Sequence, residues 1–213
     1  MKSAGAALVL LALLPAAGRA QVARFVSAGL DAGSVQVRTA PASGGGEALS
    51  GSVLGGGGAL HLGAVSFEAT YAQGNLTSDS GSATPRDLVD GVVMLAIRPV
   101  RWLTLKGGPH LRSYVNPAST RRIETWEGRL RLEGALVGDV VRGHVEGWRS
   151  FSASVNVGSP LDYLQGGSAG ISVRLPRAPF WGRLSYLIDQ AAAVDGGTET
   201  LDGVIVAIGF GGR

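Results

Sequence analysis

The stretch that decides the fold is TWEGRLRLEGALVGD, residues 125–139, in which apolar and charged side chains alternate. Successive side chains of a β-strand point to opposite faces, so a period of two separates the residues into two sets. The set on the first face is Trp126, Gly128, Leu130, Leu132, Gly134 and Leu136. The set on the second face is Thr125, Glu127, Arg129, Arg131 and Glu133. The stretch therefore predicts a strand with one apolar and one densely charged face.

The same alternation recurs along most of the chain, for example in AVSFEATYA (64–72), VDGVVMLAIR (89–98), LTLKGGPHLR (103–112) and VRGHVEGW (141–148). Short connections near residues 62–64, 98–101, 137–140 and 176–179 alternate with mostly longer, Gly- and Ser-rich ones near 41–49, 75–87, 115–122, 153–164 and 194–199. The pattern predicts about ten strands of roughly 10–15 residues each, with eight as the alternative count. The first two strands, around 22–39 and 49–61, have the least distinct boundaries.

The first twenty residues have the features of a secretory signal peptide. Lys2 precedes the apolar run AALVLLALLPAA, and the small-residue sequence AGRA ends at Ala20. A short membrane anchor is the alternative, but a spanning helix needs about 20 apolar residues. We therefore expect a signal peptide over 1–20 and one domain over 21–213. Without Lys2 and Arg19 the formal net charge falls from +3 to +1, which argues against nucleic-acid binding.

The chain resembles the small outer-membrane β-barrel proteins of bacteria. The resemblance is carried by the AGRA signal end, the alternating strands and the last strand, LDGVIVAIGFGGR (201–213). It implies an all-β, antiparallel, up-and-down transmembrane barrel in the outer membrane, with short turns in the periplasm and longer loops outside. Its partners would be outer-membrane lipids and the barrel insertion machinery, which recognises an aromatic residue ending the last strand, here Phe210. Gly211, Gly212 and Arg213 follow Phe210, a departure from that pattern.

Strand length and tryptophan placement favour a membrane barrel over a soluble, exported β-sandwich. The strands look long for a sandwich, where about 5–6 residues is common. Trp102 and Trp181 lie beside short turns, and Trp126 and Trp148 lie beside longer connections. Because membrane barrels carry aromatic girdles at both interfaces, we expect these four rings at the interfaces.

The charged face is expected to line a narrow lumen, since a barrel of about eight strands is already filled by its side chains. Buried charges persist only when they are paired. We therefore expect ion pairs to plug the lumen, for example Arg131 or Arg142 with Glu133 or Glu146. The predicted network is Glu68, Asp90, Lys106, His110, Arg112, Glu127, Arg129, Arg131, Glu133, Arg142, His144, Glu146, Arg174, Arg183 and Asp189.

Motifs for catalysis are weak. GGSAG (166–170) fits the G-x-S-x-G pattern around Ser168, but a strand pattern follows where the motif needs a helix. His144 and Glu146 share one face without further metal ligands nearby in the sequence. We expect no catalytic residue, cofactor or metal. The favoured function is a non-enzymatic barrel with a structural, narrow-channel or surface-interaction role. The alternatives are a membrane-embedded lipid hydrolase using His144, Glu146 and Ser168, and a soluble binding module.

Overall fold

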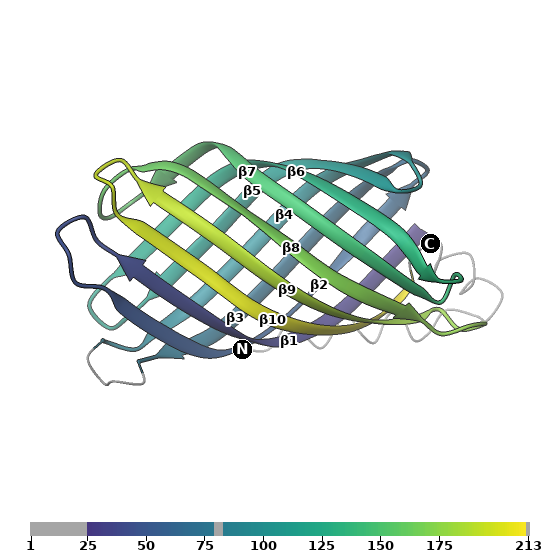
Figure 1. The fold of residues 1–213 in the computed structure, drawn as a ribbon, viewed down its shortest axis with the longest axis horizontal. Helices are drawn as coiled ribbons and strands as arrows, with labels where there is room; N and C mark the ends of the chain where they lie inside the picture. The colour runs from purple at the N-terminus through teal and green to yellow at the C-terminus, as the bar shows by residue number, and fades with distance from the viewer. Residues whose placement is uncertain (1–24, 79–82, 212–213) are drawn as a thin grey trace.

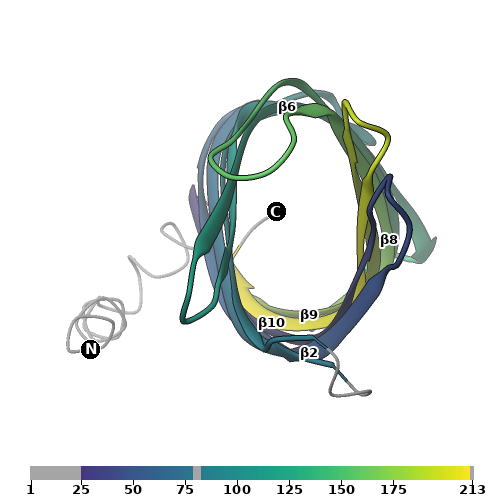
Figure 2. The same ribbon diagram turned by 90° about the vertical axis from the view of Figure 1, so that its left-hand side faces the viewer.

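The structure, a computed structural model, describes residues 25–78 and 83–211; the expected signal peptide over 1–20 lies outside this range. Its strands form one closed antiparallel barrel, seen from the side in Figure 1 and as an oval ring in Figure 2. The strands are β1 (Val26–Ala40), β2 (Glu47–Leu62), β3 (Val65–Thr77), β4 (Arg86–Val100), β5 (Leu103–Val115), β6 (Thr120–Val137), β7 (Val141–Val155), β8 (Leu161–Arg174), β9 (Phe180–Ala193) and β10 (Thr198–Gly211).

The topology is up-and-down, because every strand pairs with its neighbours in sequence. The first and last strands close the ring, with Ser27 opposite Gly211 and Ala40 opposite Thr198. This confirms the predicted ten-strand barrel, and the eight-strand count and the two-sheet sandwich are both wrong. Within the described residues, no helix is long and apolar enough to cross a membrane.

The connections divide the barrel into two ends. At one end lie the connections 63–64, 101–102, 138–140 and 175–179, and we call this the short-turn end. The connections 41–46, 116–119, 156–160 and 194–197 lie at the other, the loop end, where β3 also ends at Thr77 and β4 begins at Arg86. The connection expected over 75–87 is shorter because Asn75 pairs with Asp87 and Leu76 with Arg86, which extends both flanking strands. Gly63 and Gly138 have positive φ angles of 69° and 51°, which let the chain reverse in two of the short turns.

The outer surface of the short-turn half is an apolar belt. On β9 the outward apolar residues run from Phe180 to Ile188, and on β5 from Leu103 to Leu111. A membrane-spanning strand needs about 9–11 residues, so these stretches have the length required to cross a bilayer. Apolar side chains near the middle of four strands point outward within this belt and are exposed, as lipid contact requires: Leu130, Leu132, Val145 and Leu184.

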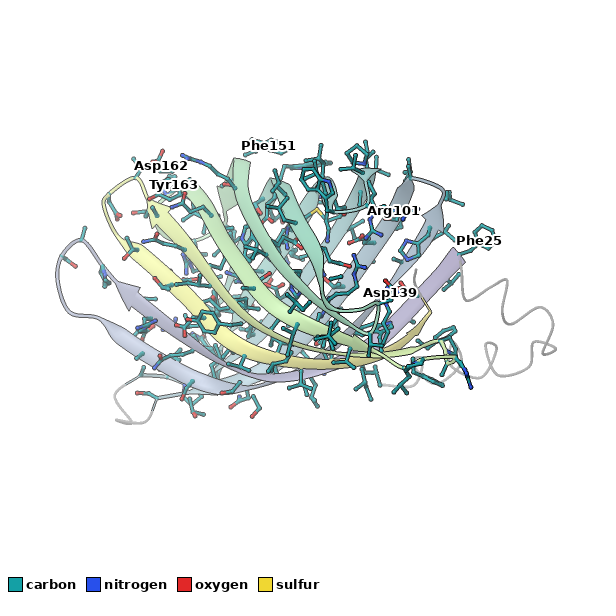
Figure 3. All side chains as sticks on the ribbon, turned by 45° about the vertical axis from the view of Figure 1, so that its right-hand side comes forward. Phe25, Arg101, Asp139, Phe151, Asp162 and Tyr163 are labelled. Carbon is teal, nitrogen blue, oxygen red and sulfur yellow. The ribbon has the colours of Figure 1, made fainter. Side chains whose placement is uncertain are left out.

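The outer surface changes character toward the loop end, where a polar collar replaces the apolar belt. The side chains of Arg38 and Asp202 form an ion pair of 2.5 Å there, and Asn75 donates a hydrogen bond of 3.0 Å to Asp87. Figure 3 shows Asp162 and Tyr163 at the loop end, and Arg101 and Asp139 toward the other end. The remaining outward polar residues of the collar include Gln36, Ser52, Gln73, Arg122, Glu124, Gln165, Gln190 and Thr200.

The interior of the loop half is apolar, the reverse of the interior expected from the charged faces. Inward side chains from nine strands pack together there, and we call this cluster the apolar seal. The seal comprises Val35, Val37, Leu49, Val53, Leu76, Leu88, Tyr114, Ile123, Leu161, Leu164, Ala191 and Leu201, with Ala153 and Val155 of β7 packed against it. The loop half therefore has the apolar-inside, polar-outside order of a water-soluble protein, whereas the short-turn half has the inverted order of a membrane barrel.

Two of the four tryptophans lie where an interface girdle requires them. Trp102 and Trp126 are exposed on the outer surface. The expectation is wrong for Trp148 and Trp181, whose side chains turn inward: Trp148 contacts Asp189, and Trp181 lines a cavity with Arg183. Residues two apart on a strand point to the same face, and Trp148 and Trp181 are each two residues from an inward-facing residue, Glu146 and Arg183.

Candidate functional site

The middle of the lumen holds a network of ion pairs, in which His110 on β5 bridges two carboxylates. The imidazole Nδ1 lies 2.5 Å from Glu127 Oε1, and the Nε2 lies 2.9 Å from Asp90 Oδ2. Thr125, which faces His110 across the β5–β6 pair, donates a hydrogen bond of 2.9 Å to the same Glu127 oxygen. Three neighbouring strands thus contribute one buried cluster of polar side chains.

Arg112 crosses the lumen and joins opposite walls of the barrel. Its Nε donates to Asp90 on β4 at 2.9 Å, and its Nη2 donates to Asp189 on β9 at 2.8 Å. The other oxygen of Asp189 accepts a hydrogen bond of 3.0 Å from the indole of Trp148 on β7. Because these strands are far apart in the ring, the contacts brace the barrel from inside.

Glu146 on β7 collects three cations. Its carboxylate lies 3.4 Å from Lys106, 3.7 Å from Arg129 and 3.5 Å from Arg131. Arg129 also pairs with Glu127 at 2.8 Å, and its guanidinium lies 4.8 Å from the ring centroid of Trp148.

The network continues on both sides of Glu146. Lys106 reaches Glu68 at 3.0 Å. Glu133 pairs with Arg131 at 3.2 Å and with Arg142 at 2.6 Å. We call the whole set the ion-pair layer: Glu68, Asp90, Lys106, His110, Arg112, Glu127, Arg129, Arg131, Glu133, Arg142, Glu146 and Asp189. It brings together most of the side chains that the alternating pattern assigns to the lumen.

Three predicted lumen residues lie outside these ion pairs. Arg174 and Arg183 face a cavity nearer the short-turn end. His144 is buried, and its Nδ1 has no hydrogen-bond partner among the described residues.

The arrangement does not assemble the alternative hydrolase. Ser168 stands opposite Glu146, and His144 stands opposite Gly170, so serine and histidine are out of register. In the part of the chain that the structure describes, no hydrogen bond joins Ser168 to His144. The carboxylate of Glu146 contacts Lys106 and two arginines. A nucleophile needs a base within hydrogen-bond reach, and this geometry does not supply one.

The described residues do not form a metal site. Across residues 25–78 and 83–211, no group of three or more His, Asp or Glu side chains is placed to hold a metal ion. The carboxylates of the ion-pair layer are occupied by Arg, Lys and His side chains.

Above the ion-pair layer, toward the loop end, a second polar cluster interrupts the apolar seal. The hydroxyl of Tyr114 donates a hydrogen bond of 2.7 Å to Glu199, which also pairs with Arg121. None of these three residues belongs to the predicted lumen network. Tyr114 and Arg112 are two residues apart on β5, so the alternation that assigns Arg112 to the lumen also assigns Tyr114 to it.

Below the ion-pair layer, the lumen opens into a water-accessible space that we call the vestibule. It consists of two adjoining cavities of about 170 Å³ and about 210 Å³. The turn residues Gly63 and Ala64 line the outer cavity, which places its mouth at the short-turn end. Asp31 and Arg98 line the vestibule, although neither belongs to the predicted lumen network.

Comparison with known proteins gives architectural similarity only. No family model matches the sequence, and no curated protein matches it. Among solved structures, the outer-membrane protease OmpT from Escherichia coli is similar with a TM-score of 0.49 and 9% identity over 87% of this chain and 95% of OmpT. The translocator domain of autotransporter NalP from Neisseria meningitidis has a TM-score of 0.49 and 11% identity over 87% of this chain and 88% of that domain. Neisserial surface protein A has a TM-score of 0.37 and 10% identity over 86% of this chain and 96% of its own.

Proposed function

We propose that this protein is a non-conducting, non-catalytic barrel of the bacterial outer membrane that holds a rigid, water-soluble collar above the lipid. The observation that carries the proposal is the reversal of polarity between the two halves. A lipid-facing belt surrounds the short-turn half, whereas an apolar seal fills the loop half. The barrel is anchored by the first half and closed by the second. A structural or surface-interaction role fits this arrangement better than a narrow channel.

The closure has two components that act in series. The ion-pair layer fills the middle of the lumen with paired side chains, and the seal fills the loop half with apolar ones. An ion crossing the apolar part of the seal would leave water without gaining a partner there, which costs several kcal/mol for each charge. The polar cluster within the seal is already paired internally, since Glu199 accepts from Tyr114 and pairs with Arg121. The proposed closure therefore leaves ions no water-filled path along the described part of the lumen.

Planar-bilayer recording tests the closure. We expect the purified protein to give small or absent conductance. Leu49→Ser combined with Leu164→Ser should admit water to the seal and raise the frequency of conducting steps, because both side chains are fully buried there. Leu30→Ser combined with Leu54→Ser, on the outer surface, is the matched control and should conduct no more than the unmodified protein. Large, stable steps from the unmodified protein would refute the closure.

The orientation is tested by proteolysis. Short turns of outer-membrane barrels face the periplasm, so the connection 78–85 should lie outside the cell. Protease added to intact cells should cut there before it cuts elsewhere, since exposed loop tips are preferred cleavage sites. Cleavage only after the outer membrane has been disrupted would reverse the orientation.

A further inference from the structure

The outer cavity of the vestibule is lined by more cations than anions. Four arginines and two glutamates surround it: Arg98, Arg131, Arg174, Arg183, Glu68 and Glu133. Both glutamates are already neutralised, because Glu68 pairs with Lys106 at 3.0 Å and Glu133 pairs with Arg131 at 3.2 Å and Arg142 at 2.6 Å.

Three arginines remain without an ion-pair partner among the described residues. Arg174 on β8 and Arg183 on β9 lie on neighbouring strands, Arg98 lies on β4 in another part of the ring, and all three line the same cavity. Over residues 25–78 and 83–211, none of the three has a carboxylate within the 4.0 Å of an ion pair. They differ in this respect from the arginines of the ion-pair layer, each of which has at least one carboxylate partner.

Two of these arginines are held in place by neutral neighbours. The guanidinium of Arg183 lies 5.5 Å from the ring centroid of Trp181, which lines the same cavity. Arg98 Nε lies 3.4 Å from the hydroxyl oxygen of Thr104, to which it donates. Stacking on an aromatic ring is a common way to orient an arginine for recognition of an anion.

We propose that the outer cavity of the vestibule is an anion-binding site for a phosphate group, either inorganic phosphate or the phosphate ester of a lipid headgroup. A phosphate carries up to two negative charges and several acceptor oxygens, which three guanidinium groups can share. The hydroxyl of Thr104 also lines the cavity, and because it accepts a hydrogen bond from Arg98 it keeps its own proton to donate to the same ligand.

Size and access agree with this assignment. A cavity needs about 10–15 Å³ to hold one water molecule, so the space of about 170 Å³ has ample room for a phosphate group and its bound water. Because the seal closes the loop end and the mouth lies among the short turns, the ligand enters from the short-turn end. The site does not depend on whether the barrel conducts, so it goes beyond the proposed closure and is tested independently of it.

Isothermal titration of inorganic phosphate into the full chain, folded in a neutral detergent, tests the site. We expect saturable binding that weakens about tenfold or more in each of Arg98→Gln, Arg174→Gln and Arg183→Gln, because each loses a charged hydrogen bond to the ligand. Arg122→Gln is the matched control: its side chain is exposed in the outer collar, and binding should be unchanged. No saturable binding to the folded protein, or equal binding by the triple variant, would overturn the proposal.

A second measurement uses the unmodified protein and so avoids any folding defect of the variants. Phenylglyoxal modifies accessible guanidinium groups, and peptide mass spectrometry identifies the arginines that have reacted. Phosphate should protect Arg98, Arg174 and Arg183 and leave the reaction of Arg122 unchanged. Equal modification with and without phosphate would count against the site.

Short-chain lipids distinguish the two sources of the phosphate. We expect dihexanoyl phosphatidic acid, below its micelle concentration, to compete with inorganic phosphate, and dihexanoyl phosphatidylcholine to compete less because its choline is repelled by the arginines. Tighter binding of phosphatidic acid than of inorganic phosphate assigns the site to a lipid headgroup, and the reverse assigns it to free phosphate. Failure of both anions to bind would refute the site.

Discussion

Glu127→Ala is expected to lower the free energy of unfolding by about 3–5 kcal/mol, the usual cost of removing one partner from a buried ion pair. The Glu127 side chain is fully buried, at 0% exposure, and its carboxylate contacts His110 at 2.5 Å, Arg129 at 2.8 Å and Thr125 at 2.9 Å. Its removal leaves a histidine and an arginine facing an uncharged methyl group inside the barrel. Reversible urea unfolding in lipid micelles measures the change.

Glu124→Ala supplies the matched control on the same strand. Glu124 is outward in the collar, its side chain is 59% exposed, and its only described ion pair is a 3.8 Å contact with Arg122. Exposed pairs of this kind contribute about 1 kcal/mol or less, so the variant should unfold almost like the parent. Equal losses for the two variants would show that the ion-pair layer does not hold the barrel together.

The strict pleat of a strand explains what the sequence was able to predict. Alternation alone placed Glu127, Arg129 and Arg131 on one face of β6, and the structure has them on one face. Strand number followed from counting alternating segments between turn residues. Closure into a ring adds no new information about which residues share a face, so this part of the fold is local.

The apolar seal could not be predicted in the same way. On β1, Val35 and Val37 alternate with Gln36 and Arg38, which shows that the two faces differ but not which one is inside. The charged faces in the short-turn half predict a polar interior along the whole barrel. In the loop half, however, the apolar side chains point inward and the polar ones outward. Which face points inward depends on how far each strand projects beyond the membrane, and the sequence of a single strand does not show this distance.

Contacts between side chains on opposite sides of the lumen could not be predicted from the sequence either. Arg112 and Asp189 are 77 residues apart and meet only because the ring brings β5 and β9 to opposite sides of a narrow space. The closed ring likewise brings Arg98 of β4 to the same cavity as Arg174 and Arg183, which lie on the neighbouring strands β8 and β9. Parity identifies candidates for a lumen site, whereas the strand stagger of the closed barrel decides which candidates touch.

Leu184→Arg is expected to cost about 2–4 kcal/mol, the cost of an arginine facing lipid near the bilayer midplane. Leu184 lies midway along the outward apolar stretch from Phe180 to Ile188. Its neighbours across the sheet are also apolar: Ile171 on β8 and Val206 on β10. The guanidinium would therefore find no polar partner beside it and would have to stretch toward the interface. Unfolding in lipid bilayers rather than detergent measures this, since only a bilayer imposes a fixed apolar thickness.

Gln190→Arg, six residues further along β9 on the same face, should cost almost nothing. Gln190 faces outward in the collar, and its neighbours across the sheet are Gln165 and Thr200. If the collar stands in water, an arginine there keeps its hydration, as charges near the interfaces cost only about 0–1 kcal/mol. The contrast between the two variants on one strand therefore locates the edge of the bilayer between Leu184 and Gln190. Equal losses in the free energy of unfolding at both positions would place the collar in lipid. They would contradict the proposal that the short-turn half is anchored in the membrane while the loop half projects from it.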